Sequence, residues 1–102
     1  MVINAKGKVE LSFLEKEIIK NALNSSEVIA FPTDTVYGLG ANALLKKSVE
    51  KIYKIKQRDK EKPLILFLAS IDEVSNYIEE PDLLKNNIFE KYWPGPLTAI
   101  FE

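Results

Sequence analysis

Regularly spaced apolar side chains first occur in the sequence just after Ser12. Ser12 and Glu15 have the spacing of a capping box, in which a serine closes the start of a helix and a glutamate reaches back to it. Apolar residues then recur at helical spacing, which predicts a helix over residues 13–24. The apolar positions of this helix are Phe13, Ile18 and Ala22.

A second helix is predicted in the middle of the chain. Ser48 is its expected N-cap, and the helix should end near Ile55 because Pro63 favours extended backbone in the residue before it. The apolar side of this helix would consist of Val49, Ile52, Tyr53 and Ile55. Lysines near its last turn would complement the negative end of the helix dipole.

Two more helices are predicted towards the end of the sequence. Ser70 and Glu73 repeat the capping-box spacing and predict a short helix. A longer helix is expected from Pro81 or Asp82 to about Tyr92, where the Trp-Pro-Gly-Pro sequence that follows should stop it. Its core face would consist of Leu83, Leu84, Ile88 and Phe89.

Short apolar runs between these helices are predicted to be strands. They cover residues 28–31, 36–41, 64–68 and 97–101, and the run 64–68 has the clearest pattern. Because strands and helices alternate, we expect an α/β fold with a twisted, mixed or mostly parallel β-sheet covered by helices. The last run reaches the end of the sequence, so residues 1–102 are expected to form the N-terminal portion of a single, apparently truncated domain.

Composition excludes several classes of protein. The sequence has 46% hydrophobic and 28% charged residues, which is ordinary for a globular domain. It has no cysteine and no histidine, which removes disulfides, thiolate metal sites and the commonest general base. No apolar run approaches the ~18 residues of a membrane span, and no secretion signal begins the chain. A cytoplasmic protein without a catalytic triad is therefore expected.

Positive charge is concentrated in one segment, although the formal net charge is only −1. Between Lys46 and Lys62 there are eight basic and three acidic residues, and the rest of the chain has six basic and twelve acidic residues. This asymmetry is compatible with a focused anion site or with a solvated helix face that is rich in lysine.

Two cations in this segment are candidates for binding an anion together. Lys56 and Arg58 are two residues apart, which places them on one face only if the backbone is extended. We expect both, with Lys62, on a non-helical segment after the second helix. Arginine offers a bidentate fork to phosphate and lysine a compact charge, so the three could converge on one anion.

A polar, glycine-bearing segment, FPTDTVYGLG, spans residues 31–40. It is either a loop that presents backbone and small side chains to a ligand, or a strand–turn–strand corner whose glycines supply positive φ. Asp34 is favoured as a turn cap over a metal ligand. Trp93, near the end of the chain, is favoured as a lid on the core over a platform for stacking a nucleobase.

Three segments together resemble the YrdC-like family. They read FPTDTVYGLG, KQRDKEKPL and WPGPLT, and the resemblance extends from about Val28 to Phe101. It implies a threonylcarbamoyl-adenylate synthase, a nucleotidyltransferase that joins L-threonine, bicarbonate and ATP and acts in tRNA modification. The resemblance covers about the first half of a typical family domain, so this chain alone is expected to be weakly active or inactive.

The resemblance also implies roles for individual residues. Lys56 and Arg58 match the family motif that binds the triphosphate of ATP, and Lys62 lies in the same neighbourhood. The threonine pocket would be lined by Thr33, Thr35, Tyr37 and Phe67, with Thr35 the first choice for direct contact. Phe67 stands where many members have a histidine. Mg²⁺ held partly by substrate oxygens is expected, and no residue is assigned as a metal ligand or as a general acid or base.

Two other functions remain open. The segment Lys46–Lys62 could bind RNA through phosphate contacts, a property that has been proposed for YrdC-like domains. The apolar edge over residues 97–101 could instead pair with a second copy or with another chain in a non-catalytic half-domain.

Overall fold

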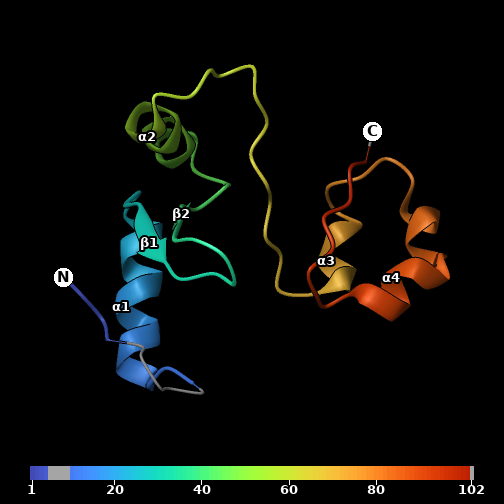
Figure 1. The fold of residues 1–102 in the computed structure, drawn as a ribbon, viewed down its shortest axis with the longest axis horizontal. Helices are drawn as coiled ribbons and strands as arrows, with labels where there is room; N and C mark the ends of the chain where they lie inside the picture. Colours follow the sequence, from blue (N-terminus) through green and yellow to red (C-terminus); the bar gives the residue numbers. More distant parts are fainter. Residues whose placement is uncertain (5–9, 102) are drawn as a thin grey trace. The chain divides into compact units, whose positions relative to one another are not determined.

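The computed structural model describes residues 1–4 and 10–101, and the chain divides into two compact units. The first unit covers Met1–Leu64 and the second begins at Ile65. Figure 1 shows α1, β1, β2 and α2 in the first unit and α3 and α4 in the second. In the described part of the chain, no helix is long and apolar enough to cross a membrane.

The first helix is the one that the sequence predicts. Helix α1 spans Phe13–Asn24, with Ser12 as its N-cap. The Glu15 amide donates to the Ser12 hydroxyl at 3.3 Å, and the Glu15 carboxylate accepts from the Ser12 amide at 2.8 Å. This reciprocal pair satisfies two of the backbone donors that every helix start leaves free. Helix α1 then packs against β1 (Figure 1).

The two strands of the first unit form an antiparallel pair. Strand β1 covers Ile29–Phe31 and β2 covers Gly38–Gly40, with Phe31 opposite Gly38. A six-residue connection is too short for the crossover that a parallel pair requires, which explains the antiparallel direction. The strand predictions for residues 28–31 and 36–41 are confirmed, with shorter bounds.

Glycine in β2 makes room for an aromatic ring. A Cβ added at Gly40 would lie 2.9 Å from Cε1 of Phe31, and one added at Gly38 would lie 3.0 Å from its Cζ. Neither glycine has a φ in the left-handed region. Of the two alternatives for this segment, the one in which its glycines supply positive φ is therefore wrong on that point, and close packing of Phe31 is the reason for the glycines.

Helix α2 spans Lys46–Lys56 and is predicted correctly except at its ends. Ser48 lies inside the first turn and is fully buried, so its expected role as the N-cap is wrong. Leu45 occupies the cap position without a side-chain hydrogen bond. The turn before it is closed by Asn42, whose side-chain oxygen accepts from the Leu44 amide at 3.0 Å. A surface ion pair, Lys51 to Glu27 at 3.4 Å, connects α2 to the residues before β1.

The second unit contains shorter helices than the sequence predicts. Helix α3 covers only Ile71–Val74, and η1, a 3₁₀ helix, covers Pro81–Lys85. Helix α4 covers Asn87–Tyr92. The single helix expected from residue 81 or 82 to 92 is wrong because Asn86 interrupts it. Asn86 has an extended backbone, and its side chain accepts from the Ile88 amide at 3.0 Å, which starts a new helix.

The second capping box, predicted from Ser70 and Glu73, does not form. The Ser70 side chain makes no cap hydrogen bond, and the Glu73 carboxylate accepts from the Ala69 amide at 3.3 Å instead of from Ser70. The expected core face of the longer helix is also only partly correct. Phe89 is buried, but Leu83 and Ile88 are exposed. A 3₁₀ turn followed by a separate helix does not keep these positions on one face.

The strands predicted over residues 64–68 and 97–101 are wrong. Neither segment joins a sheet in the described part of the chain, where β1 and β2 form the sheet that is present. An apolar run indicates that a segment would be buried in a sheet, but a strand exists only where a neighbouring backbone completes its hydrogen bonds. Helices and a sheet are both present, so the α/β class itself is confirmed.

The core of the second unit is aromatic. The rings of Phe89 and Trp93 have their centroids 4.7 Å apart, and Phe101 stacks on Phe89 at 5.7 Å. The Trp93 indole donates to the Leu97 carbonyl at 2.7 Å. At Gly95 an added Cβ would lie 2.4 Å from the Tyr92 carbonyl oxygen, so the tight turn after Trp93 requires glycine. Trp93 thus packs as the core lid that the sequence favours.

Candidate functional site

The basic segment begins where α2 ends. Gln57 has φ 48° and ψ 38°, a left-handed conformation that terminates the helix. The Arg58 amide returns to the Tyr53 carbonyl at 3.0 Å. Arg58 and Lys62 therefore lie outside the helix, as predicted. Lys56 is its last residue, so the expectation that it lies on the non-helical segment is wrong.

The residues after α2, 57–63, form an organised loop, which we call the cation loop. The Asp59 carboxylate accepts from the Glu61 amide at 3.0 Å, and the Asp59 carbonyl accepts from the Lys62 amide at 3.1 Å. The Arg58 guanidinium donates to the Pro63 carbonyl at 3.3 Å. The Tyr53 hydroxyl donates to the Lys62 carbonyl at 2.7 Å. These contacts turn the chain back towards α2.

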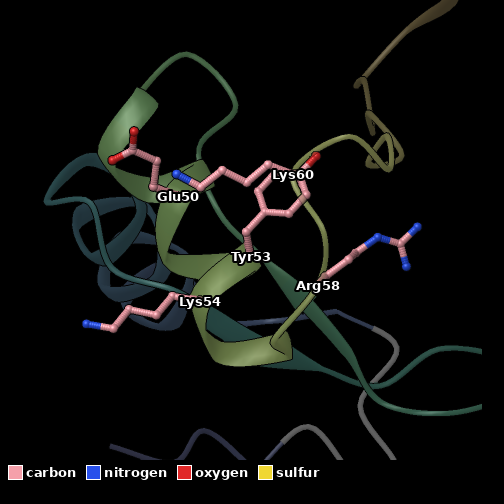
Figure 2. Close-up of a pocket in the computed structure, with 5 residues that line it drawn as sticks. All are labelled: Glu50, Tyr53, Lys54, Arg58 and Lys60. Carbon is pink, nitrogen blue, oxygen red and sulfur yellow. The ribbon is translucent and has the colours of Figure 1, made fainter.

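An open hollow of about 410 Å³ lies between α2 and the cation loop. It is lined by Glu50, Tyr53, Lys54, Arg58 and Lys60. Figure 2 shows the Tyr53 side chain pointing from α2 towards the loop, while Arg58 and Lys54 extend in different directions. Three cations and one carboxylate leave a net positive charge, which favours an anion in this hollow.

The hollow differs from the set of cations predicted from the sequence. Arg58 is common to both, but Lys56 and Lys62 do not line it, and Lys54 and Lys60 do. Sequence reasoning assigned no site role to Glu50, Tyr53, Lys54 or Lys60. The sequence contains a signal for two of these residues. Glu50 and Lys54 are four residues apart, so they lie on the same face of the predicted helix.

The connection between β1 and β2 carries the predicted threonine-binding residues of the first unit. Thr33 organises this turn, because its hydroxyl accepts from the Thr35 amide at 3.2 Å and donates to the Val36 carbonyl. The Thr35 and Thr33 hydroxyl oxygens are 3.4 Å apart. Tyr37 is 77% exposed, and Thr35 is exposed as well. The loop therefore presents hydroxyl and phenol groups to solvent from a fixed turn.

Asp34 does not cap this turn. Thr33 provides the side-chain hydrogen bonds, and in the part of the chain that the structure describes none involves the Asp34 carboxylate. The prediction that Asp34 caps the turn is wrong, because the Thr33 hydroxyl makes the hydrogen bonds to the backbone of the turn, at the Thr35 amide and the Val36 carbonyl. Within residues 1–4 and 10–101, no group of three or more His, Cys, Asp or Glu side chains gathers that could hold a metal ion.

Phe67 belongs to the second unit and is 76% exposed. Thr33, Thr35 and Tyr37 belong to the first unit. The four residues predicted to bind threonine are thus divided between the two units, and their joint role stays a prediction.

Comparison with known proteins identifies the family. Residues 21–102 match the model of the Sua5, YciO and YrdC proteins, described as "Telomere recombination". The chain belongs to the Sua5/YciO/YrdC family. The resemblance to YrdC-like proteins that the sequence suggests is confirmed.

Individual relatives agree with this assignment. The family member from Bacillus subtilis strain 168, named threonylcarbamoyl-AMP synthase, is 41% identical over 93 residues, which cover 89% of this chain and 27% of that protein. A protein of the same name from Photobacterium profundum is 43% identical over 85 residues, covering 80% of this chain and 45% of the relative.

A solved structure also matches. The crystal structure of P. abyssi Sua5 complexed with L-threonine has a TM-score of 0.76 and 34% sequence identity, covering 85% of this chain and 26% of that one. The α/β fold class is confirmed by this match as well. This member of the Sua5/YciO/YrdC family thus spans less than half the length of these relatives.

Proposed function

We propose that this chain contributes the nucleotide-binding and threonine-binding loops of a threonylcarbamoyl-AMP synthase. The reaction would join L-threonine, bicarbonate and ATP into threonylcarbamoyl-AMP, with release of pyrophosphate and water, in the modification of tRNA. The observation that carries the proposal is the cation loop on a chain that is 41% identical to a named synthase over 93 residues. The P. abyssi Sua5 structure, a complex with L-threonine, supports the threonine half of the proposal.

The charges of the cation loop suit a triphosphate. Arg58 uses one guanidinium nitrogen to hold the Pro63 carbonyl, which fixes the direction of the side chain. The other N–H groups of a guanidinium are then available to phosphate oxygens, since the group has five donors. We assign Arg58, Lys56 and Lys62 to ATP, and Lys54 and Lys60 join them because they line the hollow.

Threonine would bind at the turn between β1 and β2. Thr35, Thr33 and Tyr37 offer hydroxyl groups that can hydrogen-bond an amino-acid substrate, and Thr33 already orders the turn. We also assign Phe67 to threonine, because it stands where many family members have a histidine. The rate of the reaction would depend on how the substrates are positioned and on how their negative charge is neutralised, because these two effects dominate the transfer of a nucleotidyl group.

Magnesium is expected to accompany ATP as its counter-ion. The described residues hold no cluster of three potential ligands, so they do not fit a metal site made by this chain. Oxygens of the triphosphate would supply the coordination, which is the usual mode for Mg²⁺.

Calorimetric titration with ATP, with and without L-threonine, tests the proposal. Arg58→Ala is expected to weaken ATP binding about tenfold, because it removes a charge-assisted hydrogen bond. Lys20→Ala is the matched control, since it removes one exposed positive charge from α1, away from the cation loop. Equal ATP affinity for the two variants, or no binding at millimolar ATP, would contradict the proposal.

A further inference from the structure

Tyr53 connects the two ends of the cation loop. Its backbone carbonyl accepts from the Arg58 amide at 3.0 Å, where the chain leaves α2. Its hydroxyl donates to the Lys62 carbonyl at 2.7 Å, just before Pro63. One residue of a regular helix thus contacts the loop at its beginning and at its end. Figure 2 shows its side chain pointing from α2 towards the loop.

Within the part of the chain that the structure describes, no other side-chain hydrogen bond of the loop ties it to α2. Asp59 bonds the Glu61 and Lys62 amides, which closes a local turn only. Arg58 bonds the neighbouring Pro63 carbonyl. Tyr53 therefore supplies the side-chain contact that fixes the turn relative to the helix.

We propose that Tyr53 is a positioning residue, which holds the cation loop in the conformation that presents Arg58 and Lys60 to an anion. This inference rests on the proposed binding of ATP. The hydroxyl proton of Tyr53 is committed to the Lys62 carbonyl, so Tyr53 acts through the loop. Ordering the loop before binding lowers the entropy cost of collecting its cations around a phosphate.

Tyr53→Phe removes only this hydroxyl, and two measurements on the 102-residue chain test its effect. The first is amide hydrogen exchange at Arg58, Glu61 and Lys62, whose amides are hydrogen-bonded in the ordered loop. Exchange is expected to accelerate roughly twofold to tenfold, the effect of one net hydrogen bond on local opening. The second is ATP affinity by calorimetry, which is expected to fall roughly twofold to tenfold as well.

Tyr77→Phe is the matched control. Tyr77 lies in the second unit and its hydroxyl makes no hydrogen bond in the part of the chain that the structure describes. This variant should leave both measurements unchanged. A second comparison, Tyr53→Leu, removes the ring as well and should loosen the loop at least as much as Tyr53→Phe.

The outcomes separate the inference from the proposed function. Unchanged exchange in Tyr53→Phe would overturn the positioning role, whatever the ATP affinity. Faster exchange with unchanged ATP affinity would also overturn it, provided that Arg58→Ala weakens binding. If the unaltered chain binds no ATP, the proposed function fails first, and the role of Tyr53 towards a nucleotide fails with it. Faster exchange together with weaker ATP binding supports both.

Discussion

Ser48 is fully buried, and its hydroxyl has no hydrogen-bond partner among the described residues. The sequence suggests a helix cap at this position, because serine is a preferred N-cap. The helix in fact begins at Lys46, so the hydroxyl is enclosed inside the first turn. A buried hydroxyl without a hydrogen-bond partner destabilises the folded state, because it loses its hydrogen bonds to water and none replaces them.

Ser48→Ala is therefore expected to raise the free energy of unfolding by about 1 kcal/mol, because it removes the unpaired hydroxyl and improves helix propensity. Chemical denaturation followed by circular dichroism would measure this. Ser75→Ala is the control, since the Ser75 hydroxyl donates to the Asp72 carbonyl at 2.7 Å and its loss should destabilise the chain. A loss of stability in Ser48→Ala would show that the hydroxyl is satisfied in solution.

The predictability of the candidate site also varies residue by residue. Arg58 is found from sequence because its motif and its charge both point to an anion. Tyr53 is assigned only to an apolar helix face, since nothing in the sequence indicates that its hydroxyl reaches a carbonyl nine residues later. The role of Asp34 is predicted incorrectly, because Thr33 competes for the same backbone groups.

At the level of elements, α1 is predicted well because both of its start signals are local. Ser12 and Glu15 are three residues apart, and the bonds between them form within one turn. The helix predicted over residues 81–92 fails for an equally local reason, because Asn86 can start a helix as well as continue one. The strands predicted over residues 64–68 and 97–101 fail because a strand depends on a partner.

Ser12→Ala should destabilise α1 by about 1 kcal/mol, the usual effect of losing an N-cap side chain. The expected signs are lower helix content by circular dichroism and faster amide exchange at Glu15. Glu17→Ala serves as the control, because it removes an exposed ion pair with Lys20 at 3.8 Å, and such surface pairs contribute little to stability. If Ser12→Ala and Glu17→Ala lost the same amount of helix content and of amide protection, the capping box would not be stabilising α1.

At the level of the whole molecule, few apolar side chains are fully enclosed. Among the described residues, the buried apolar ones are Ile52 in the first unit and Val74 and Phe89 in the second. Many large apolar side chains remain exposed, including Phe13, Phe67 and Ile100. Since hydrophobic burial is the main favourable contribution to folding, we expect this chain to have a low free energy of unfolding.

Phe89→Ala is expected to unfold the second unit, because replacing a buried phenylalanine with alanine costs about 3–5 kcal/mol. Trp93, the one tryptophan of the sequence, lies against Phe89. Its fluorescence should shift to the red when the second unit unfolds and exposes the indole to water. Exchange protection in α1 should persist, because α1 belongs to the first unit.

Phe13→Ala makes the same chemical change at a phenylalanine that is 80% exposed, and it should leave the tryptophan fluorescence unchanged. If Phe89→Ala also removed the exchange protection of α1, the chain would unfold as one cooperative block and not as two units.

The family, the class of fold, the first helix, the first two strands and Arg58 as a candidate ligand of an anion can all be predicted from the residue pattern. These features depend on motifs, or on signals that lie within a few residues of one another. The burial of Ser48, the hydrogen bond from Tyr53 to the cation loop and the lack of strand pairing between residues 64–68 and the rest of the described chain become visible only in the folded structure. Each of these features depends on which groups the folded chain brings into contact. The pattern of neighbouring residues does not indicate those contacts, because the groups involved are distant in the sequence.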